Sequence, residues 1–253
     1  MRNRVTIVLA ILFVATVALL LSWNTRDHEP VYQGIRLGAW LDDLTSPTPD
    51  LRASATNAIR HMGTNAIPAL LQEASARQSF PKAILTELMR RQPLVKFHIA
   101  DHQARALAGF RALGTTGALG LAEGFTNQNK WIRFGCVGQW EMCSDYPAIL
   151  FPPLFDCLKD EDPLVRSRAA NAVGLVHLQP EKVVPVLTEM LSDPNKDVRS
   201  MAALGLCMYG TQATSAVPTL LKQLTNSGPE FQFWGTNALK AIDPAAAARV
   251  GIK

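Results

Sequence analysis

The stretch DPLVRSRAANAV at Asp162–Val173 decides the fold of this protein, because it recurs at a fixed distance. Thirty-three positions later stands NKDVRSMAALGL at Asn195–Leu206, and thirty-three positions earlier stands NKWIRFGCVGQW at Asn129–Trp140. Self-similarity at such a period is typical of repeat proteins, in which one unit cannot bury its apolar face alone. The sequence therefore predicts a stack of similar units.

Each unit is predicted to be a pair of antiparallel helices. In the central unit, Asp162 is suited to cap a helix and Pro163 to occupy its first position. Apolar residues follow at the helical spacing of one buried stripe, namely Val165, Ala169, Ala172, Val173 and Val176. After the break at Gln179-Pro180, a second helix is expected with its own stripe, formed by Val183, Val184, Leu187 and Leu191. Two helices of about 12 residues joined by a short turn make a helical hairpin.

About six such hairpins are expected, in an all-α solenoid over residues 37–253. They lie near residues 48–73, 101–125, 129–160, 161–193, 194–226 and 227–253, with an irregular insertion at 74–100. The first two copies are out of register, since Leu51–Thr64 matches His102–Thr115 at an offset of 51. A helix at Leu37–Leu44, apolar on one face, is expected to cap the N-terminal end of the stack.

The pattern Asp-Pro-x-Val-Arg-x-x-Ala-Ala-x-Ala of residues 162–172, followed by Val-Pro-x-Leu at 184–187, resembles the HEAT repeat, in particular its phycobilisome-lyase-type variant. The Tyr-x-Gly-x-x-Leu-x-x-Trp-Leu stretch at 32–41, with Ile-Asp-Pro-Ala-Ala-Ala at 242–247, is similar to uncharacterised exported bacterial HEAT-repeat proteins. The resemblance implies a curved α-solenoid used for binding, and it implies no reaction. Two copies depart from the pattern, with Leu119 in place of proline and Gln232 in place of arginine.

The N-terminal segment is expected to be a transmembrane signal anchor. Residues 5–23 carry no charge over 19 positions, close to the length of about 20 residues that spans a bilayer. Arg2 and Arg4 favour a cytoplasmic location for residues 1–4. The protein is thus expected to span the bacterial inner membrane once, with a linker at 24–36 and a periplasmic solenoid. The alternative is secretion after signal-peptide cleavage, although the apolar part of a signal peptide is normally shorter.

The composition of the sequence limits the classes of partner and ligand that we expect. Beyond Arg2 and Arg4, the sequence has 23 basic and 21 acidic residues and no basic stripe, so no nucleic-acid partner is expected. The sequence contains no nucleophile–base motif and no glycine-rich phosphate loop. We therefore expect a protein that is not an enzyme, with no cofactor, no metal and no evident small-molecule ligand.

The four cysteines fit no familiar zinc spacing. Cys136 and Cys207 fall at positions expected in the core of first helices. A disulfide between Cys143 and Cys157 stays an open alternative, because an exported protein meets an oxidising compartment.

Two sets of residues are the candidate sites. The first is the series Arg133, Arg166 and Arg199, one per repeat, which we expect to stack as a ladder and to bond a carbonyl or carboxylate of a neighbouring turn. The second comprises aromatic residues at positions that are polar or variable in sister repeats, namely Trp131, Phe134, Phe233 and Trp234. Aromatic side chains are prominent in interface hot spots, so these are candidate partner-binding residues. For Phe233 and Trp234, however, we expect the tail 244–253 to fold over them as a cap, whereas for Trp131 and Phe134 burial in the core stays an equal alternative.

The sequence thus favours a non-enzymatic, membrane-anchored, extracytoplasmic scaffold for protein–protein interaction. A lyase-like or enzyme-associated HEAT protein is the first alternative, and a structural component of the cell envelope is the second. If the aromatic residues are not the binding surface, the second helices around Glu189 and Lys222 are expected to provide it.

Overall fold

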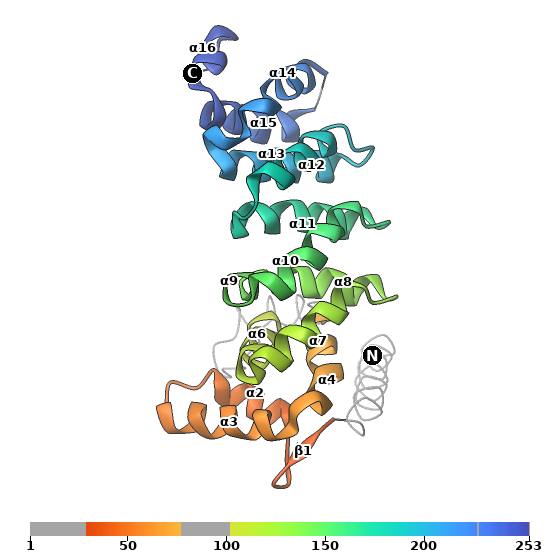
Figure 1. Cartoon of the computed structure of the whole chain (residues 1–253), viewed down its shortest axis with the longest axis vertical. Coiled ribbons are helices and arrows are strands. Elements are labelled where there is room, and N and C mark those ends of the chain that lie inside the picture. Colours follow the sequence, from red (N-terminus) through yellow and green to blue (C-terminus); the bar gives the residue numbers. More distant parts are fainter. Residues whose placement is uncertain (1–28, 77–101, 227, 253) are drawn as a thin grey trace, which may run out of the picture.

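The computed structural model describes residues 29–76, 102–226 and 228–252, and in this part the protein is an α-solenoid. Its helices stack along one long axis, with the first repeats at one end and the last repeats at the other (Figure 1). The predicted repeat solenoid is confirmed. The expected anchor at 5–23 lies outside the described residues, as does most of the insertion. Across the three described segments, no helix is long and apolar enough to cross a membrane.

The described part opens with a short hairpin followed by a helix. Strands β1 (Val31–Tyr32) and β2 (Ile35–Arg36) pair antiparallel, with Gln33 and Gly34 at positive φ in the turn. The described part of the segment expected as a linker at 24–36 therefore contains a short hairpin. Helix α2 (Leu37–Leu44) begins where the sequence predicts it and buries one apolar face.

The solenoid is built from paired helices, which recur along the sequence. Their bounds are α3 (Pro49–Met62) with α4 (Ile67–Ser75), α6 (His102–Leu113) with α7 (Thr115–Phe125), α8 (Lys130–Val137) with α10 (Pro147–Asp156), α11 (Pro163–Val176) with α12 (Pro180–Met190), α13 (Lys196–Tyr209) with α14 (Val217–Asn226), and α15 (Pro229–Ile242) with α16 (Pro244–Arg249). Short 3₁₀ turns accompany them at η1 (Gly63–Ala66), η2 (Cys157–Lys159) and η3 (Gly210–Ala216).

Capping side chains fix where several first helices begin. Asn129, Asp162 and Asn195 each accept a hydrogen bond from the backbone N–H two residues further on, at the starts of α8, α11 and α13. A cap of this kind contributes about 1 kcal/mol by satisfying an otherwise unpaired N–H. The same position in each repeat thus sets the start of each helix.

The first helices α11, α13 and α15 pack on one another in succession and hold much of the core (Figure 1). Ala169 and Ala202 are fully buried on these helices. A Cβ atom on Gly205 would lie 2.7 Å from the carbonyl oxygen of Ala170, so α11 and α13 approach more closely than a larger residue allows. One continuous apolar cluster runs from Leu37 to Ile242.

The third repeat departs from the expected pattern. Its first helix is short, since α8 ends at Val137 and a short helix, α9 (Met142–Asp145), follows. Glycine weakens a helix, and a Cβ atom on Gly138 would clash with Nη2 of Arg168. The missing side chain of Gly138 therefore makes room for an arginine of the next repeat.

Candidate interaction surface

Arginine side chains of the first helices fasten the loops between repeats. Nη1 of Arg133, on α8, donates to the carbonyl oxygens of Asn127 (2.8 Å) and Gln128 (3.2 Å), in the loop before its own helix. Its Nε and Nη2 donate to the carboxylate of Asp160, at 2.7 and 2.9 Å, in the loop that follows the repeat. The hydrogen bond to Asp160 raises the pKa of Arg133, against the opposing effect of burial. One guanidinium therefore joins two successive boundaries.

Arg166, on α11, repeats this geometry one unit further along. Its Nη1 donates to the carbonyl oxygens of Asp160 (2.8 Å) and Glu161 (3.1 Å). Its Nε and Nη2 donate to the carboxylate of Asp193, at 2.9 and 3.1 Å. Such two-point contacts between guanidinium and carboxylate are the strong, directional kind of ion pair.

Arg199, on α13, makes only the two carbonyl bonds of this arrangement. Its Nη1 donates to the carbonyl oxygens of Asp193 (2.8 Å) and Pro194 (3.1 Å). The residue 27 positions after it, where the two preceding repeats have Asp160 and Asp193, is Asn226. Within the described segments, no carboxylate bonds Nε and Nη2 of Arg199.

The ladder has a further member that sequence analysis missed. Nη1 of Arg52, on α3, donates to the carbonyl oxygens of Ser46 (2.7 Å) and Pro47 (2.8 Å), as the other arginines do in their own loops. The signal was present, because Leu51-Arg52 is the same apolar–arginine pair as Ile132-Arg133. The equivalent position in the second and last repeats is glutamine, and Gln103 and Gln232 donate to a backbone carbonyl as well.

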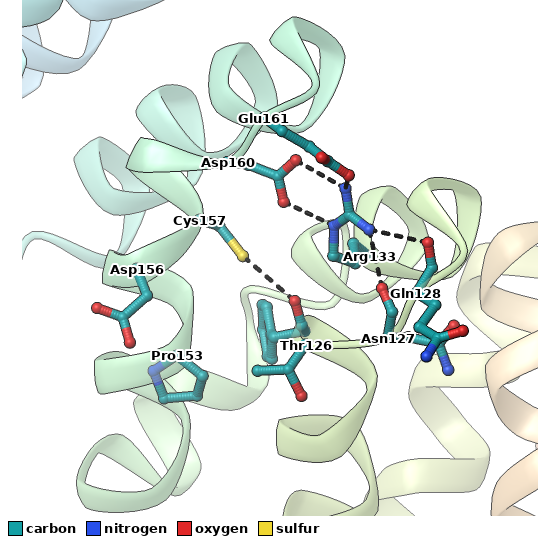
Figure 2. A pocket seen from close by; sticks show the side chains of 10 residues that line it. Thr126, Asn127, Gln128, Arg133, Pro153, Asp156, Cys157, Asp160 and Glu161 are labelled. Atoms are coloured by element: carbon teal, nitrogen blue, oxygen red, sulfur yellow. Dashed lines mark hydrogen bonds and ion pairs between the residues drawn. The ribbon is translucent and has the colours of Figure 1, made fainter.

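A pocket of about 510 Å³ lies beside Arg133, near the ends of α7 and α10 (Figure 2). Its lining comprises Phe125, Thr126, Asn127, Gln128, Arg133, Pro153, Asp156, Cys157, Asp160 and Glu161. Asp160 and Glu161 are already bonded to Arg133. Burial raises the pKa of Cys157 to about 12, so its thiol stays protonated at neutral pH and is a poor nucleophile. Neither this thiol nor the two bonded carboxylates are therefore activated for catalysis.

Two of the candidate aromatic residues lie together on α8. The rings of Trp131 and Phe134 meet edge to face, with centroids 6.3 Å apart, and both side chains are half-buried. The guanidinium of Arg168, on α11, stacks over Phe134 at 4.2 Å from the ring centroid. We call Trp131, Phe134 and Arg168 the aromatic–arginine cluster, and it joins two successive repeats.

A lysine borders this cluster. Nζ of Lys130 lies 5.1 Å from the Trp131 ring centroid and 2.7 Å from the Asp162 carboxylate. The hydrogen bond from Lys130 lowers the pKa of Asp162, with a smaller contribution from the backbone N–H of Leu164. The charge of Lys130 is thus neutralised by Asp162, whereas no carboxylate among the described residues neutralises the charge of Arg168.

Arg168 is the unusual charge of the cluster. Burial lowers its pKa, and no hydrogen-bond acceptor or carboxylate contacts it among the residues that the structure describes. A partly desolvated cation without an acceptor is unfavourable, and stacking on Phe134 offsets part of that cost. Arg168 therefore keeps donors that another molecule can satisfy.

The aromatic pair of the last repeat is not covered by the tail. Phe233 is 60% exposed and Trp234 is half-buried, with their rings edge to face at 4.8 Å. The expected cap over Phe233 was wrong, because Asp243 caps α16 directly after α15. The tail then packs on Leu239 instead.

The cysteines and potential metal ligands give no second site. All four cysteines are free thiols, so the disulfide between Cys143 and Cys157 is not formed. Cys136 is buried, as expected, whereas Cys207 is only half-buried. Among residues 29–76, 102–226 and 228–252, no group of three His, Cys, Asp or Glu side chains is placed to hold a metal ion.

Comparison with known proteins identifies the repeats. Models of HEAT repeats match residues 150–176 and 184–250, and neither is of the phycobilisome-lyase type. No curated protein matches the sequence. Similar solved structures include an engineered protein that is 20% identical, with a TM-score of 0.45 over 82% of this chain and 96% of that one.

A second engineered protein is 17% identical, with a TM-score of 0.48 over 83% of this chain and 99% of that one. A designed armadillo repeat protein in complex with the peptide (KR)4 is also 17% identical, with coverages of 82% and 99% and a TM-score of 0.45. These likenesses are too distant to bear on what the protein binds. The matched repeats and the stacked hairpins together show an α-solenoid that contains HEAT repeats.

Proposed function

We propose that this protein is a non-enzymatic scaffold that binds a protein partner through the aromatic–arginine cluster. HEAT-repeat solenoids typically serve as protein-interaction scaffolds and are generally not catalytic. The observation that carries the proposal is the cluster itself, in which half-buried Trp131 and Phe134 adjoin an arginine without an acceptor. Trp, Tyr and Arg are the residues most enriched in interface hot spots.

The energetics of Arg168 support binding at this place. Its guanidinium has already lost part of its hydration in the free protein, so a partner that supplies an acceptor causes little further desolvation. Stacking on Phe134 holds the planar group in one orientation, which reduces the side-chain entropy lost on binding. A carbonyl or carboxylate of the partner, with an apolar group over Trp131, would complete the contact.

The proposal is tested by photo-crosslinking at the cluster. A photoreactive phenylalanine analogue at Trp131 should capture a discrete protein in cells, and the same analogue at Leu119, which is 53% exposed on α7, should not capture that protein. The partner is then identified and purified. Its affinity for the double variant Trp131→Ser/Phe134→Ser should fall about 30-fold, the equivalent of a hot spot of about 2 kcal/mol.

A matched control separates binding from folding. Leu119→Ser removes an exposed apolar group elsewhere and should leave the partner's affinity unchanged. If the double variant loses several kcal/mol of stability, its rings belong to the core. If it folds normally and binds as the wild type does, this cluster is not the binding surface.

We also propose that residues 5–23 anchor the solenoid on the extracytoplasmic side of a bacterial inner membrane. The uncharged run and the preceding Arg2 and Arg4 support this. The protein should then stay in the membrane pellet through carbonate extraction, and a reporter enzyme fused at Lys253 should be active only outside the cytoplasm. A mature N-terminus near Asn24 would show secretion after cleavage instead.

A further inference from the structure

We propose that the pocket beside Arg133 binds a lysine side chain of a partner protein. This pocket, of about 510 Å³, lies between the C-terminal ends of α7 and α10 (Figure 2). The inference rests on the proposed scaffold function, but it concerns a second surface, because the residues of the aromatic–arginine cluster do not line the pocket. It follows from the difference between the third repeat and the two repeats after it.

The pocket is present where the third repeat has a short side chain. Cys157 lies on its wall at the end of α10. The Sγ atom of Cys157 lies 3.9 Å from the carbonyl oxygen of Phe125, so the thiol points across the pocket toward the end of α7 (Figure 2). Thirty-three positions later the sequence has Met190, and thirty-three positions further on it has Gln223. Both of these side chains are longer than that of cysteine.

The longer side chains occupy the corresponding space in their own repeats. Nε2 of Gln223 donates to Oγ of Ser192 at 3.0 Å, and Ser192 stands in the register where Thr126 lines the pocket. The glutamine thus reaches from one second helix to the end of the preceding one. Met190 holds the same position in the fourth repeat and is only 6% exposed. Cys157 is too short to reach across, so the third repeat leaves the space open.

The shape of this space favours an unbranched side chain. Methionine and glutamine, which stand at this position in the sister repeats, are both unbranched, and a side chain of similar length from another protein can take their place. Phe125 and Pro153 give the pocket an apolar wall against which methylene groups can pack. Lysine has such a stem, and lysine side chains commonly bury the stem along apolar surface while the charged end stays in polar surroundings.

The polar part of the lining favours a positive charge. It contains the carboxylates of Asp156, Asp160 and Glu161 and the guanidinium of Arg133. Arg133 pairs with Asp160 and Glu161, whereas none of the residues that the structure describes pairs with Asp156. Burial raises the pKa of the Cys157 thiol, and Asp160 and Asp156 raise it further while Arg133 lowers it. Negative charge therefore prevails at the wall of the pocket.

A lysine suits this pocket better than an arginine does. The lysine ammonium is a compact charge on a flexible stem, and it follows the outline of the methionine and glutamine that stand here in the sister repeats. A guanidinium is planar and binds best to both oxygens of one carboxylate. Both oxygens of Asp160 are already held by Arg133, at 2.7 and 2.9 Å.

The experiment follows the threonine methyl signals of the full-length protein in detergent by NMR. The probe is the peptide acetyl-Gly-Ser-Lys-Ser-Gly-amide, and the matched peptide has norleucine, which has the same stem without the ammonium, in place of lysine. The Thr126 signal, assigned from Thr126→Ser, should shift and saturate with the lysine peptide. The affinity for the lysine peptide should be about tenfold higher than for the norleucine peptide, as expected for hydrogen bonds to a charged group.

The Thr219 methyl group provides an internal control within the same sample. Thr219, on α14, stands in the register of Pro153, in the repeat where Gln223 reaches across to Ser192. Its signal, assigned from Thr219→Ser, should not shift with either peptide, because the corresponding space is already occupied.

Three variants test the space and the charge separately. Cys157→Met supplies the side chain of the next repeat and should weaken the lysine peptide about tenfold or more, whereas Cys157→Ala keeps the space open and should bind as the wild type does. Asp156→Asn should weaken the lysine peptide about threefold, as for one partly exposed charge pair, and should leave the norleucine peptide unaffected. Asp156 is exposed, so this variant tests the inference even if methionine disturbs the packing at Cys157.

The inference is wrong if the Thr126 signal does not respond or if the two peptides bind equally well. It is also wrong if a folded Cys157→Met variant binds the lysine peptide as the wild type does. These outcomes leave the crosslinking test at Trp131 unaffected, so the two proposals can fail separately.

Discussion

Replacing Asp160 by asparagine tests how much the arginine ladder stabilises the solenoid. Asp160 accepts two hydrogen bonds from Arg133, and both side chains are 8% exposed. It also accepts the backbone N–H of Asp162 at 2.8 Å through Oδ1. Asparagine can keep that turn bond, so the substitution removes the charge and one acceptor and little else. It places an NH₂ group against a guanidinium donor.

The magnitude follows from the number and burial of these bonds. Hydrogen bonds to charged groups contribute about 1.5–3 kcal/mol each, and removal of one partner from a buried ion pair costs about 3–5 kcal/mol. Arg133 keeps its two carbonyl bonds, and Glu161 remains 3.2 Å away to share the charge. We therefore expect Asp160→Asn to lower the free energy of unfolding by about 2 kcal/mol.

Urea unfolding of residues 24–253, followed by far-ultraviolet circular dichroism, measures this loss from the midpoint and slope. Glu161→Gln is the matched control, because that side chain is 86% exposed and its removal should cost less than about 0.5 kcal/mol. Combining Asp160→Asn with Arg133→Gln should give a loss smaller than the sum of the two, since both remove the same contact. Equal losses for Asp160→Asn and Glu161→Gln would refute the reasoning.

Two further predictions concern packing and pH. Ala169 is fully buried, so Ala169→Leu should cost about 1–3 kcal/mol through overpacking, whereas Ser167→Ala should hardly change the melting temperature. Lys130 lowers the pKa of Asp162 in the folded state, so this stabilisation is complete above the ordinary carboxyl pKa of about 3.9 and is lost as the pH falls through the lowered value. Urea midpoints at pH 7 and pH 2.5 should therefore differ less for Asp162→Asn than for the wild type, and an equal difference would contradict the assignment.

The arginine ladder could be predicted from the repeat period because each arginine is recognised within its own repeat unit. Arg133, Arg166 and Arg199 recur in register, and so do Asp160 and Asp193, 27 positions after the first two. The sequence predicts a carbonyl or carboxylate of a neighbouring turn as the partner of each arginine, but it does not identify these acids, since a sequence does not show which loop lies opposite a given helix.

Only the two aromatic residues of the aromatic–arginine cluster could be predicted from the sequence. Trp131 and Phe134 stand out because sister repeats have other residue types there. The stacking of Arg168 on Phe134 depends on the contact between α8 and α11 and on the space that Gly138 leaves for the guanidinium. The position of the tail was not predictable either, because it depends on the direction in which the Asp243 cap turns the backbone away from Phe233.

The two kinds of bond made by Arg133 and Arg166 suit the ladder to assembly during synthesis. The carbonyl bonds of Arg166 span five and six residues, so they can form as soon as that helix leaves the ribosome. Its carboxylate partner lies 27 residues further on and arrives with the end of the same repeat. Contacts of such short sequence separation favour fast folding. Each unit can therefore fold on the one made before it, without waiting for the C-terminus.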